Sequence, residues 1–257
     1  MNNMQAAIDI RELSFSYKDG FRNKKSVLNK LTISVAEGDT VGFLGINGAG
    51  KTTAIKILLG LLKQESGEVT ILGKQAGSLA IRKKIGYLPE HPCYYWYLTS
   101  EELLRMYAGL FRLDKKTTNK RIDYLLELVE LNKCRKMLLK HYSKGMLHRI
   151  GLAQALINFP DILILDEPTS GLDPCGKMSV RKIINDFKAQ GKTIFFSSHE
   201  LSEVELICDK VAIINSGKLV CYSTLEVILD SIKNTYREDV PNKLERYFLK
   251  TITEVNN

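Results

Sequence analysis

Apolar and polar positions alternate at the start of the chain. Residues 7–17 and 28–35 show this alternation on either side of a basic, glycine-containing stretch at 18–25, which predicts two antiparallel strands joined by a loop. Residues 39–45 form a short apolar run, and residues 51–62 carry apolar side chains at helical spacing. The N-terminal part therefore predicts a small antiparallel β subdomain followed by a strand-loop-helix unit.

The centre of the chain is predominantly helical in pattern. Between residues 99 and 159, apolar stripes recur at 100–107, 122–131 and 144–157. Strand and helix patterns alternate on both sides of this stretch. The elements expected there are strands at 66–73, 161–166 and 193–198, helices at 178–190 and from 200, and a hairpin at 211–215 and 218–222. Such alternation favours an α/β fold with a mainly parallel sheet.

These patterns suggest one large domain with an insertion and a tail. We expect the domain at 1–230, a helical subdomain inserted at about 95–158, and a helical tail at 231–257. Leu244, Tyr247 and Phe248 fall on one helical face of that tail, which is typical of a short docking helix.

Composition and charge exclude several classes of protein. The chain has 257 residues, 44% of them apolar, and a net charge of +8, an excess that nucleic acid, anionic lipid, nucleotide phosphate or plain solvated helix faces could explain. Its five cysteines are scattered, so neither a zinc site nor a disulfide framework is indicated. No window is apolar enough to span a membrane and no leader pattern precedes the domain, so we expect a cytosolic chain.

A phosphate-binding loop is indicated at residues 45–52. Gly45-Ile-Asn-Gly-Ala-Gly50-Lys51-Thr52 fits the pattern G-x-x-x-x-G-K-[ST] and lies between a predicted strand and a predicted helix. Glycines let backbone N–H groups point at phosphate oxygens, and the helix adds the positive end of its dipole. In this chemistry Lys51 reaches the β- and γ-phosphates and Thr52 binds Mg²⁺.

Two carboxylates follow a second apolar strand. Asp166 and Glu167 come directly after residues 162–165, at the carboxyl end of the predicted sheet, where α/β folds bind ligands. Consecutive strand residues point to opposite faces, so we expect Asp166 near Mg²⁺ and Glu167 near an attacking water. His199 lies at the end of another predicted strand, whereas His91, His141 and His148 are read as structural.

Together these motifs resemble the nucleotide-binding subunit of an ATP-binding cassette (ABC) transporter along nearly the whole chain. Tyr142-Ser-Lys-Gly-Met146 resembles the ABC signature, which P-loop kinases and GTPases lack. The resemblance implies that ATP is held between two copies of the cassette. It assigns ATP contacts to Tyr17, Gly45, Asn47, Gly48, Ala49, Gly50, Lys51, Thr52, Thr53, Glu90, Ser143, Gly145 and Asp173. It also makes Glu167 and His199 catalytic, and Thr52, Glu90 and Asp166 the residues near Mg²⁺.

Two positions depart from the common family pattern. The signature has Tyr142, Lys144 and Met146 in place of three of the usual residues, whereas Ser143 and Gly145 remain. Glu90 stands where a glutamine is usual, which changes the charge near the expected metal. Both variants resemble those of export-type cassettes, which include drug, sodium, polysaccharide and lipid exporters.

The function that follows is an ATP-binding and ATP-hydrolysing subunit that dimerises on ATP and powers a separate transmembrane permease from the cytoplasmic face of the membrane. The pair is a homodimer or two different ABC subunits, and no nucleic acid is expected. Residues 94–97, all aromatic, either receive the permease or belong to the core. The alternatives are a soluble ABC-type ATPase acting on nucleic acid or ribosomes, and a metabolite kinase or GTPase. Cys134-Arg135 does not complete a guanine-reading motif after Asn132-Lys133.

Overall fold

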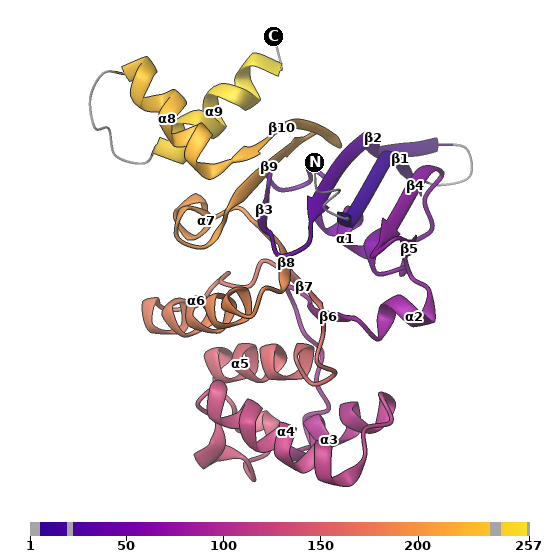
Figure 1. Ribbon diagram of the computed structural model, residues 1–257, viewed down its shortest axis with the longest axis vertical. Helices are drawn as coiled ribbons and strands as arrows, with labels where there is room; N and C mark the ends of the chain where they lie inside the picture. The colour runs from indigo at the N-terminus through magenta and orange to yellow at the C-terminus, as the bar shows by residue number, and fades with distance from the viewer. Residues whose placement is uncertain (1–5, 20–22, 237–242, 256–257) are drawn as a thin grey trace. The chain divides into compact units, whose positions relative to one another are not determined.

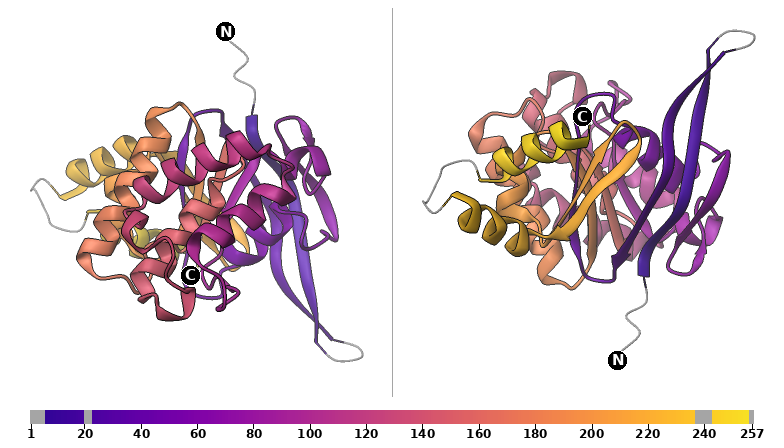
Figure 2. Two further views of the ribbon diagram at one scale, coloured as in Figure 1. Left: turned by 90° about the horizontal axis from the view of Figure 1, so that it is seen from below. Right: turned by 90° about the horizontal axis from the view of Figure 1, so that it is seen from above.

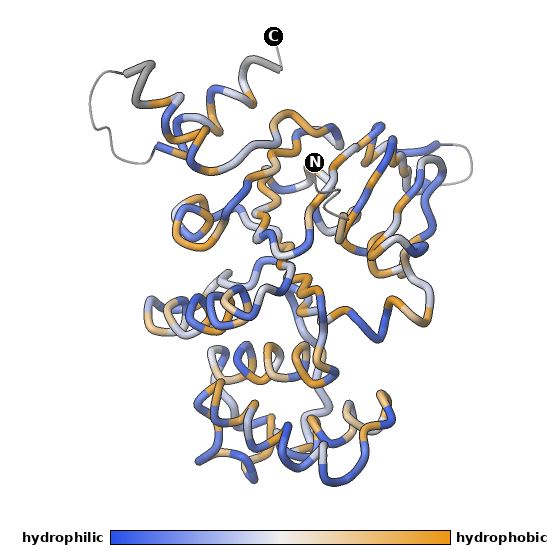
Figure 3. Tube along the Cα trace, in the orientation of Figure 1, coloured by the Kyte–Doolittle hydropathy of each residue, from blue (hydrophilic) through white to orange (hydrophobic). Residues whose placement is uncertain are grey.

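A computed structural model describes residues 6–19, 23–236 and 243–255. The chain divides into two compact units, Met1–Arg82 with Thr193–Asn257, and Lys83–Lys192. Each unit contains strands and helices, as the α/β prediction requires. Figure 3 shows apolar and polar residues alternating along the helices of the second unit, which is the pattern that predicted them.

An antiparallel sheet opens the first unit, as the sequence predicted (Figure 1). It consists of β1 (Ala6–Asp19), β2 (Asn23–Ala36), β4 (Ser66–Ile71) and β5 (Lys74–Gln75), in the order β2-β1-β4-β5. Both long strands extend further than the alternation indicated, and β5 was not predicted. Glu12 and Lys30 have positive φ at irregularities of the β1–β2 register, where bulges interrupt the simple alternation.

The second group of strands in this unit contains the element that carries the phosphate loop. β3 (Thr40–Leu44) pairs in parallel with β8 (Thr193–Ser198) on one side and β9 (Lys210–Asn215) on the other, and β9 forms a hairpin with β10 (Lys218–Thr224). Every residue of β3 and β8 is buried, which explains why neither strand alternates between polar and apolar positions. α7 (Leu201–Ile207) packs on β3 and β8.

α1 (Lys51–Leu58) follows the phosphate loop and ends four residues before the predicted boundary. Gly60 causes this early stop, because its φ is +68° and a Cβ there would collide with the backbone of Gly77. The close approach of these two glycines ends the helix where periodicity alone would continue it. The short helix α2 (Leu79–Arg82) closes this part of the unit.

The C-terminal tail forms two helices, α8 (Leu225–Tyr236) and α9 (Lys243–Val255). α8 begins before the predicted boundary of the tail. α9 contacts α7, α8 and β10, and it buries Leu244 and Phe248 while Tyr247 is half-buried. Figure 2 shows both helices beside the β9–β10 hairpin, so the tail packs within the first unit.

The second unit combines a parallel strand pair with helices. β6 (Ile85–Leu88) pairs with β7 (Ile162–Asp166), and α5 (Lys144–Ala155) packs on β6. α3 (Ser100–Leu110) and α4 (Lys115–Leu128) pack on α5 and on each other, and α6 (Pro174–Ala189) completes the unit. α4 and α6 begin earlier than predicted because Asp114 and Asp173 accept hydrogen bonds from their first-turn N–H groups.

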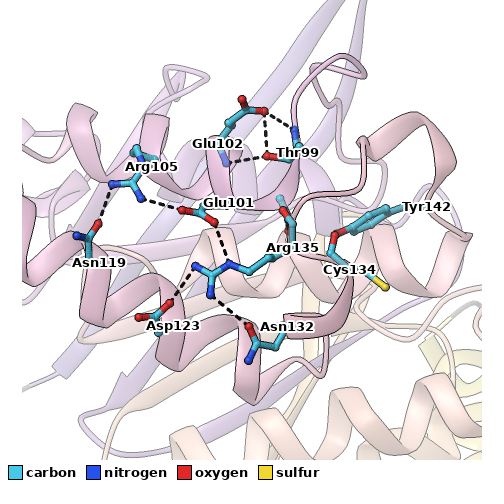
Figure 4. Close-up of polar contacts among 11 residues, drawn as sticks. Thr99, Glu101, Glu102, Arg105, Asn119, Asp123, Asn132, Cys134, Arg135 and Tyr142 are labelled. Atoms are coloured by element: carbon cyan, nitrogen blue, oxygen red, sulfur yellow. Dashed lines mark hydrogen bonds and ion pairs between the residues drawn. The ribbon is translucent and has the colours of Figure 1, made fainter.

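A polar network holds the segment that precedes α5 (Figure 4). The Arg135 guanidinium binds Glu101 of α3 at 2.8 Å, Asp123 of α4 at 2.9 Å and Asn132 at 3.3 Å. Hydrogen bonds from Arg135 and Arg105 lower the pKa of the Glu101 carboxyl, and the pKa of Arg135 is raised in turn. One side chain thus ties two helices to the 3₁₀ turn at Asn132–Cys134.

Candidate nucleotide-binding site

The phosphate loop joins the end of β3 to the start of α1. A turn with Ala49 N donating to Ile46 O at 3.1 Å curls the backbone, and Gly48 and Gly50 adopt φ of +83° and +108°. A Cβ on Gly50 would lie 2.8 Å from Leu28 Cδ2 and 3.0 Å from Val27 O. Glycine is therefore required at position 50 by both backbone conformation and space.

The β9–β10 hairpin supports this loop from the side. Gly217 N donates to Ala49 O at 3.0 Å, and a Cβ on Gly45 would lie 2.6 Å from Ile214 O. The loop is consequently fixed at both ends. The eight-residue helix α1 starts at Lys51, so its N-terminal end, the kind of helix end that binds anions, directly follows the loop.

Lys51 and Tyr17 lie at this loop. The Lys51 ammonium is buried and donates to Gly45 O at 2.6 Å, so it points back over the loop. The Tyr17 ring is 40% exposed, lies edge-on to Phe15, and its hydroxyl is 3.4 Å from Thr53 Oγ1 in α1. The structure therefore brings Tyr17 to the phosphate loop, with part of its ring free to stack on a flat ligand.

His199 lies level with the start of the loop. Leu44 and Ser198 are partners in the parallel β3–β8 register, and Gly45 and His199 are the next residues of the two strands. His199 is exposed, and Glu200 N donates to Ser198 Oγ at 2.9 Å, which turns the chain immediately after the strand. The first unit thus holds Tyr17, the phosphate loop and His199 in one region.

The second unit carries the two acidic residues. Asp166 is the last residue of β7 and is almost fully buried; together with burial, its charge raises the pKa of Tyr87 to about 12. Glu167 is also buried but has a φ of +52°. The expected strand alternation therefore ends at Asp166, and a left-handed turn sets the direction of Glu167. Such strained backbone is concentrated at functional sites.

The four aromatic residues after Glu90 do not behave alike. Tyr95, Trp96 and Tyr97 are at least half exposed, whereas Tyr94 is buried and donates from its hydroxyl to Leu147 O of α5 at 2.7 Å. Three of the four side chains therefore lie at the surface, where a partner could contact them, and the core alternative is correct for Tyr94. Glu90 itself is half-buried, 3.8 Å from the imidazole of the exposed His91.

The segment resembling the ABC signature opens α5. Ser143 is the N-cap, with Met146 N donating to its hydroxyl at 3.3 Å, and a Cβ on Gly145 would meet no atom within 4 Å. Tyr142 is buried and its hydroxyl donates to Cys134 O at 3.0 Å. The tyrosine therefore replaces an apolar residue as a core side chain, and its polar end is satisfied.

A cavity of about 470 Å³ lies in front of this helix end. Ser143 and Gly145 line it together with Gly171 and Asp173 of the loop before α6, so the structure joins the signature to that loop. Asp173 caps α6, accepting from Gly176 N at 2.7 Å. Lys144 and Arg149 also line the cavity and were not predicted. A lysine in the first turn of a helix, where acids are preferred, was the available signal.

A glycine-rich loop between a buried parallel strand and a helix, with a lysine folded over it, defines a P-loop nucleotide-binding protein. The family model described as ABC transporter matches residues 28–170. The chain therefore belongs to the ABC transporter family, and it is an ATP-binding ATPase subunit of that family.

Curated relatives and solved structures agree with this membership. The chain is 47% identical to an uncharacterized ABC transporter ATP-binding protein of Nostoc over 91% of its length and 71% of the relative's. It is 43% identical to the bacitracin transport ATP-binding protein BcrA of Bacillus licheniformis over 85% and 70%. A structure described as the ATP binding subunit of an ABC transporter matches with a TM-score of 0.81 and 30% identity, covering 95% of this chain and 99% of that one.

A second structure supports the fold alone. It is a dimeric ATP-binding cassette in a post-hydrolysis state with ADP and phosphate, which matches with a TM-score of 0.77 at 23% identity, covering 85% of this chain and 98% of that one. Among the described residues, no helix combines the length and apolar character that a bilayer span requires.

Proposed function

We propose that this chain binds ATP between two copies of itself or between itself and a paired ABC subunit, hydrolyses it, and thereby drives a separate transmembrane permease that works as an exporter. The observation that carries the proposal is the cavity in which Ser143 and Gly145 meet the loop at Gly171 and Asp173. A kinase or GTPase needs no such second phosphate-facing surface. A cassette that closes on another cassette does.

Nucleotide binding rests on the first unit. The phosphate loop supplies N–H groups and the Lys51 ammonium, and Tyr17 offers a partly exposed ring to adenine. Mg²⁺ prefers hard oxygen ligands, and the Thr52 hydroxyl and the Asp166 carboxylate fit this preference, with Glu90 as a further oxygen donor. When bound, the ion neutralises charge that develops on the phosphates.

Hydrolysis is assigned to Glu167 and His199. Glu167 would orient or deprotonate the attacking water, and its left-handed backbone holds the carboxylate in a direction that a continued strand would not give. His199 would contact the γ-phosphate from the end of β8. Phosphate release then separates the two cassettes, and closing and opening perform the work.

The test of this function uses Glu167→Gln. Because the variant keeps every proposed ATP contact and loses the base, ATP should convert it from monomer to a stable dimer in sedimentation velocity, while phosphate release falls at least about 100-fold. Lys51→Ala in the same background should abolish the dimer. Rapid turnover by Glu167→Gln, or dimerisation that ignores Lys51, would contradict the assignment.

The membrane partner is proposed on the exposed aromatics. Tyr95, Trp96 and Tyr97 are exposed aromatic side chains on the second unit, and such side chains suit a protein interface. A permease bound there would hold the subunit at the cytoplasmic face of the membrane. BcrA, a relative at 43% identity, is a bacitracin transport protein, which favours export. When the subunit is purified from native membranes, a polytopic membrane protein should co-purify with it. The Trp96→Ala variant should lose this partner.

The competing function is a soluble ABC-type ATPase that acts on RNA or ribosomes. It would use the net charge of +8 and predicts association that weakens steeply with salt. Recovery of RNA instead of a membrane protein, with ATP turnover stimulated by that RNA, would favour this alternative.

A further inference from the structure

Lys144 lines the cavity in front of α5, and it replaces one of the usual residues of the family's signature. The Lys144 side chain extends from the first turn of α5 to Gly171, where a Cβ would collide with its ammonium. Gly171 has a φ of +66°, so glycine there serves both the turn and the space that the ammonium occupies. The Lys144 ammonium therefore packs against Gly171 at the wall of the cavity.

The other charged groups of this cavity have partners. Arg149 donates to Val129 O at 3.2 Å and pairs with Glu130 at 3.4 Å, and Asp173 caps α6. Within the described part of the chain, the Lys144 ammonium makes neither a hydrogen bond nor an ion pair. It is exposed to the cavity and remains available to a ligand.

The position is also electrostatically unfavourable without a ligand. Lys144 is the first residue of a helix of 12 residues that has no acidic side chain in its first turn. Its charge therefore adds to the positive end of the helix dipole, a placement that costs stability. An anion in the cavity would reverse this cost. Polyphosphate is the anion that the proposed function supplies.

We propose that Lys144 is a phosphate-binding residue, whose ammonium contacts the triphosphate of an ATP bound to the phosphate loop of a second copy of this chain. The inference rests on the proposed function, since it requires two cassettes to share the nucleotide. Lys144 acts beside Ser143 and Gly145, and Gly171 keeps its ammonium in the cavity. Three of the usual signature residues are replaced in this chain, and the Lys144 ammonium would supply a charged contact to phosphate in their place.

The experiment measures ATP-driven dimerisation of the full chain by analytical ultracentrifugation in the Glu167→Gln background. Adding Lys144→Gln should raise the dimer dissociation constant about 100-fold, roughly tenfold for each of the two sites, because a charge-assisted contact is lost at each. Lys144→Arg should stay within about threefold of the parent. Gly171→Ala, which displaces the ammonium, should weaken the dimer in the same direction.

Two controls separate a contact from a general change. Lys140→Gln removes an equal charge from an exposed position on the same segment and should leave the dimer unchanged. Fluorescent ATP binding to the monomer should also be unchanged in Lys144→Gln, because each chain's own phosphate loop is intact. Thermal melts should show the fold preserved.

The outcomes are distinguishable. If the Glu167→Gln parent dimerises with ATP and adding Lys144→Gln leaves the dimer dissociation constant unchanged, the inference is overturned and the proposed function stands. Equal weakening by Lys140→Gln and Lys144→Gln overturns it too, because the effect would then be bulk charge. Absence of any ATP-driven dimer in the Glu167→Gln parent overturns the proposed function, and the inference with it.

Discussion

The Tyr94 hydroxyl donates a 2.7 Å hydrogen bond to the carbonyl of Leu147 in α5. Burial raises the pKa of this hydroxyl well above its usual value, so it stays protonated and remains a donor at any physiological pH. The bond attaches the segment after Glu90 to the helix that begins at Ser143. A residue expected at the surface with its neighbours is instead an internal link.

Removing that bond should destabilise the protein moderately. Tyr94→Phe keeps the ring and loses one buried hydrogen bond, so we expect the free energy of unfolding to fall by about 1 kcal/mol. Urea denaturation measures it. Tyr97→Phe is the matched control, because its side chain is 71% exposed, and it should change stability by less than about 0.5 kcal/mol. Equal effects of the two substitutions would remove the assigned role of the bond.

The same contact predicts the effect of enlarging Gly151. A Cβ there would lie 2.5 Å from Tyr94 Oη and 2.7 Å from Leu88 Cδ1. Gly151→Ala should therefore cost about 1–3 kcal/mol, although alanine is the better helix former. Gly145→Ala is its control on the same helix, since nothing lies within 4 Å of that position. A stabilised Gly151→Ala variant would show that Tyr94 does not pack across α5.

Local signals made much of this fold readable from the sequence. The phosphate loop could be placed because its glycines, lysine and flanking elements are neighbours in the chain. Strand 193–198 was predicted with its observed bounds because it is a short run that is rich in β-formers. The beginnings of α4 and α6 differ from the prediction because Asp114 and Asp173 act as N-caps, a local signal that apolar periodicity does not contain.

Other features depend on contacts between distant residues. Hydropathy cannot distinguish Tyr94 from Tyr95, because only the approach of α5 buries one of them. The left-handed backbone at Glu167 could not be predicted, because this position carries neither glycine nor asparagine, the residues that favour positive φ. The contact between Lys144 and Gly171 joins positions 27 residues apart, so no local pattern could have shown it.

The phosphate loop offers a paired test of backbone conformation against space. Gly48→Ala and Gly50→Ala both place alanine at a positive φ, but only a Cβ at position 50 would approach Leu28 and Val27. Gly50→Ala should weaken ATP binding at least about 100-fold, since strain and collision together distort the loop. Gly48→Ala should weaken it by about tenfold or less. Titration with a fluorescent ATP analogue compares them, and a reversed order would contradict the geometry.

The Arg135 network should contribute to stability in a pH-dependent way. Arg135→Gln should cost about 1 kcal/mol near pH 7, a modest figure because the pairs are partly exposed and screened. The depressed pKa of Glu101 means that its contribution is present above the usual carboxyl range and is lost as pH falls through the folded pKa. The difference between the two proteins should thus narrow below about pH 4. Lys136→Gln, an exposed neighbour, should show no such convergence.

His148 gives the sharpest prediction of acid sensitivity. It is buried in α5, its Nδ1 has no hydrogen-bond partner among the described residues, and burial together with the charge of Lys144 one turn earlier lowers its pKa from 6.5 to about 4. The unfolded state therefore binds a proton more readily than the folded state between these values. Stability from the neutral imidazole is complete above pH 6.5 and is lost progressively as pH falls towards 4, by roughly 2 kcal/mol at pH 5.

Replacing this histidine should flatten that loss. His148→Leu removes the titrating group and an unpaired polar atom, so stability near pH 7.5 should change by less than about 1 kcal/mol while the decline between pH 6.5 and 5 largely disappears. Urea denaturation at several pH values measures the slope. His141→Gln is the matched control, because His141 is exposed on the preceding segment and should leave the slope as it is. If His148→Leu declines with pH as steeply as the parent, another group is responsible for the acid sensitivity, and the buried neutral imidazole has no part in it.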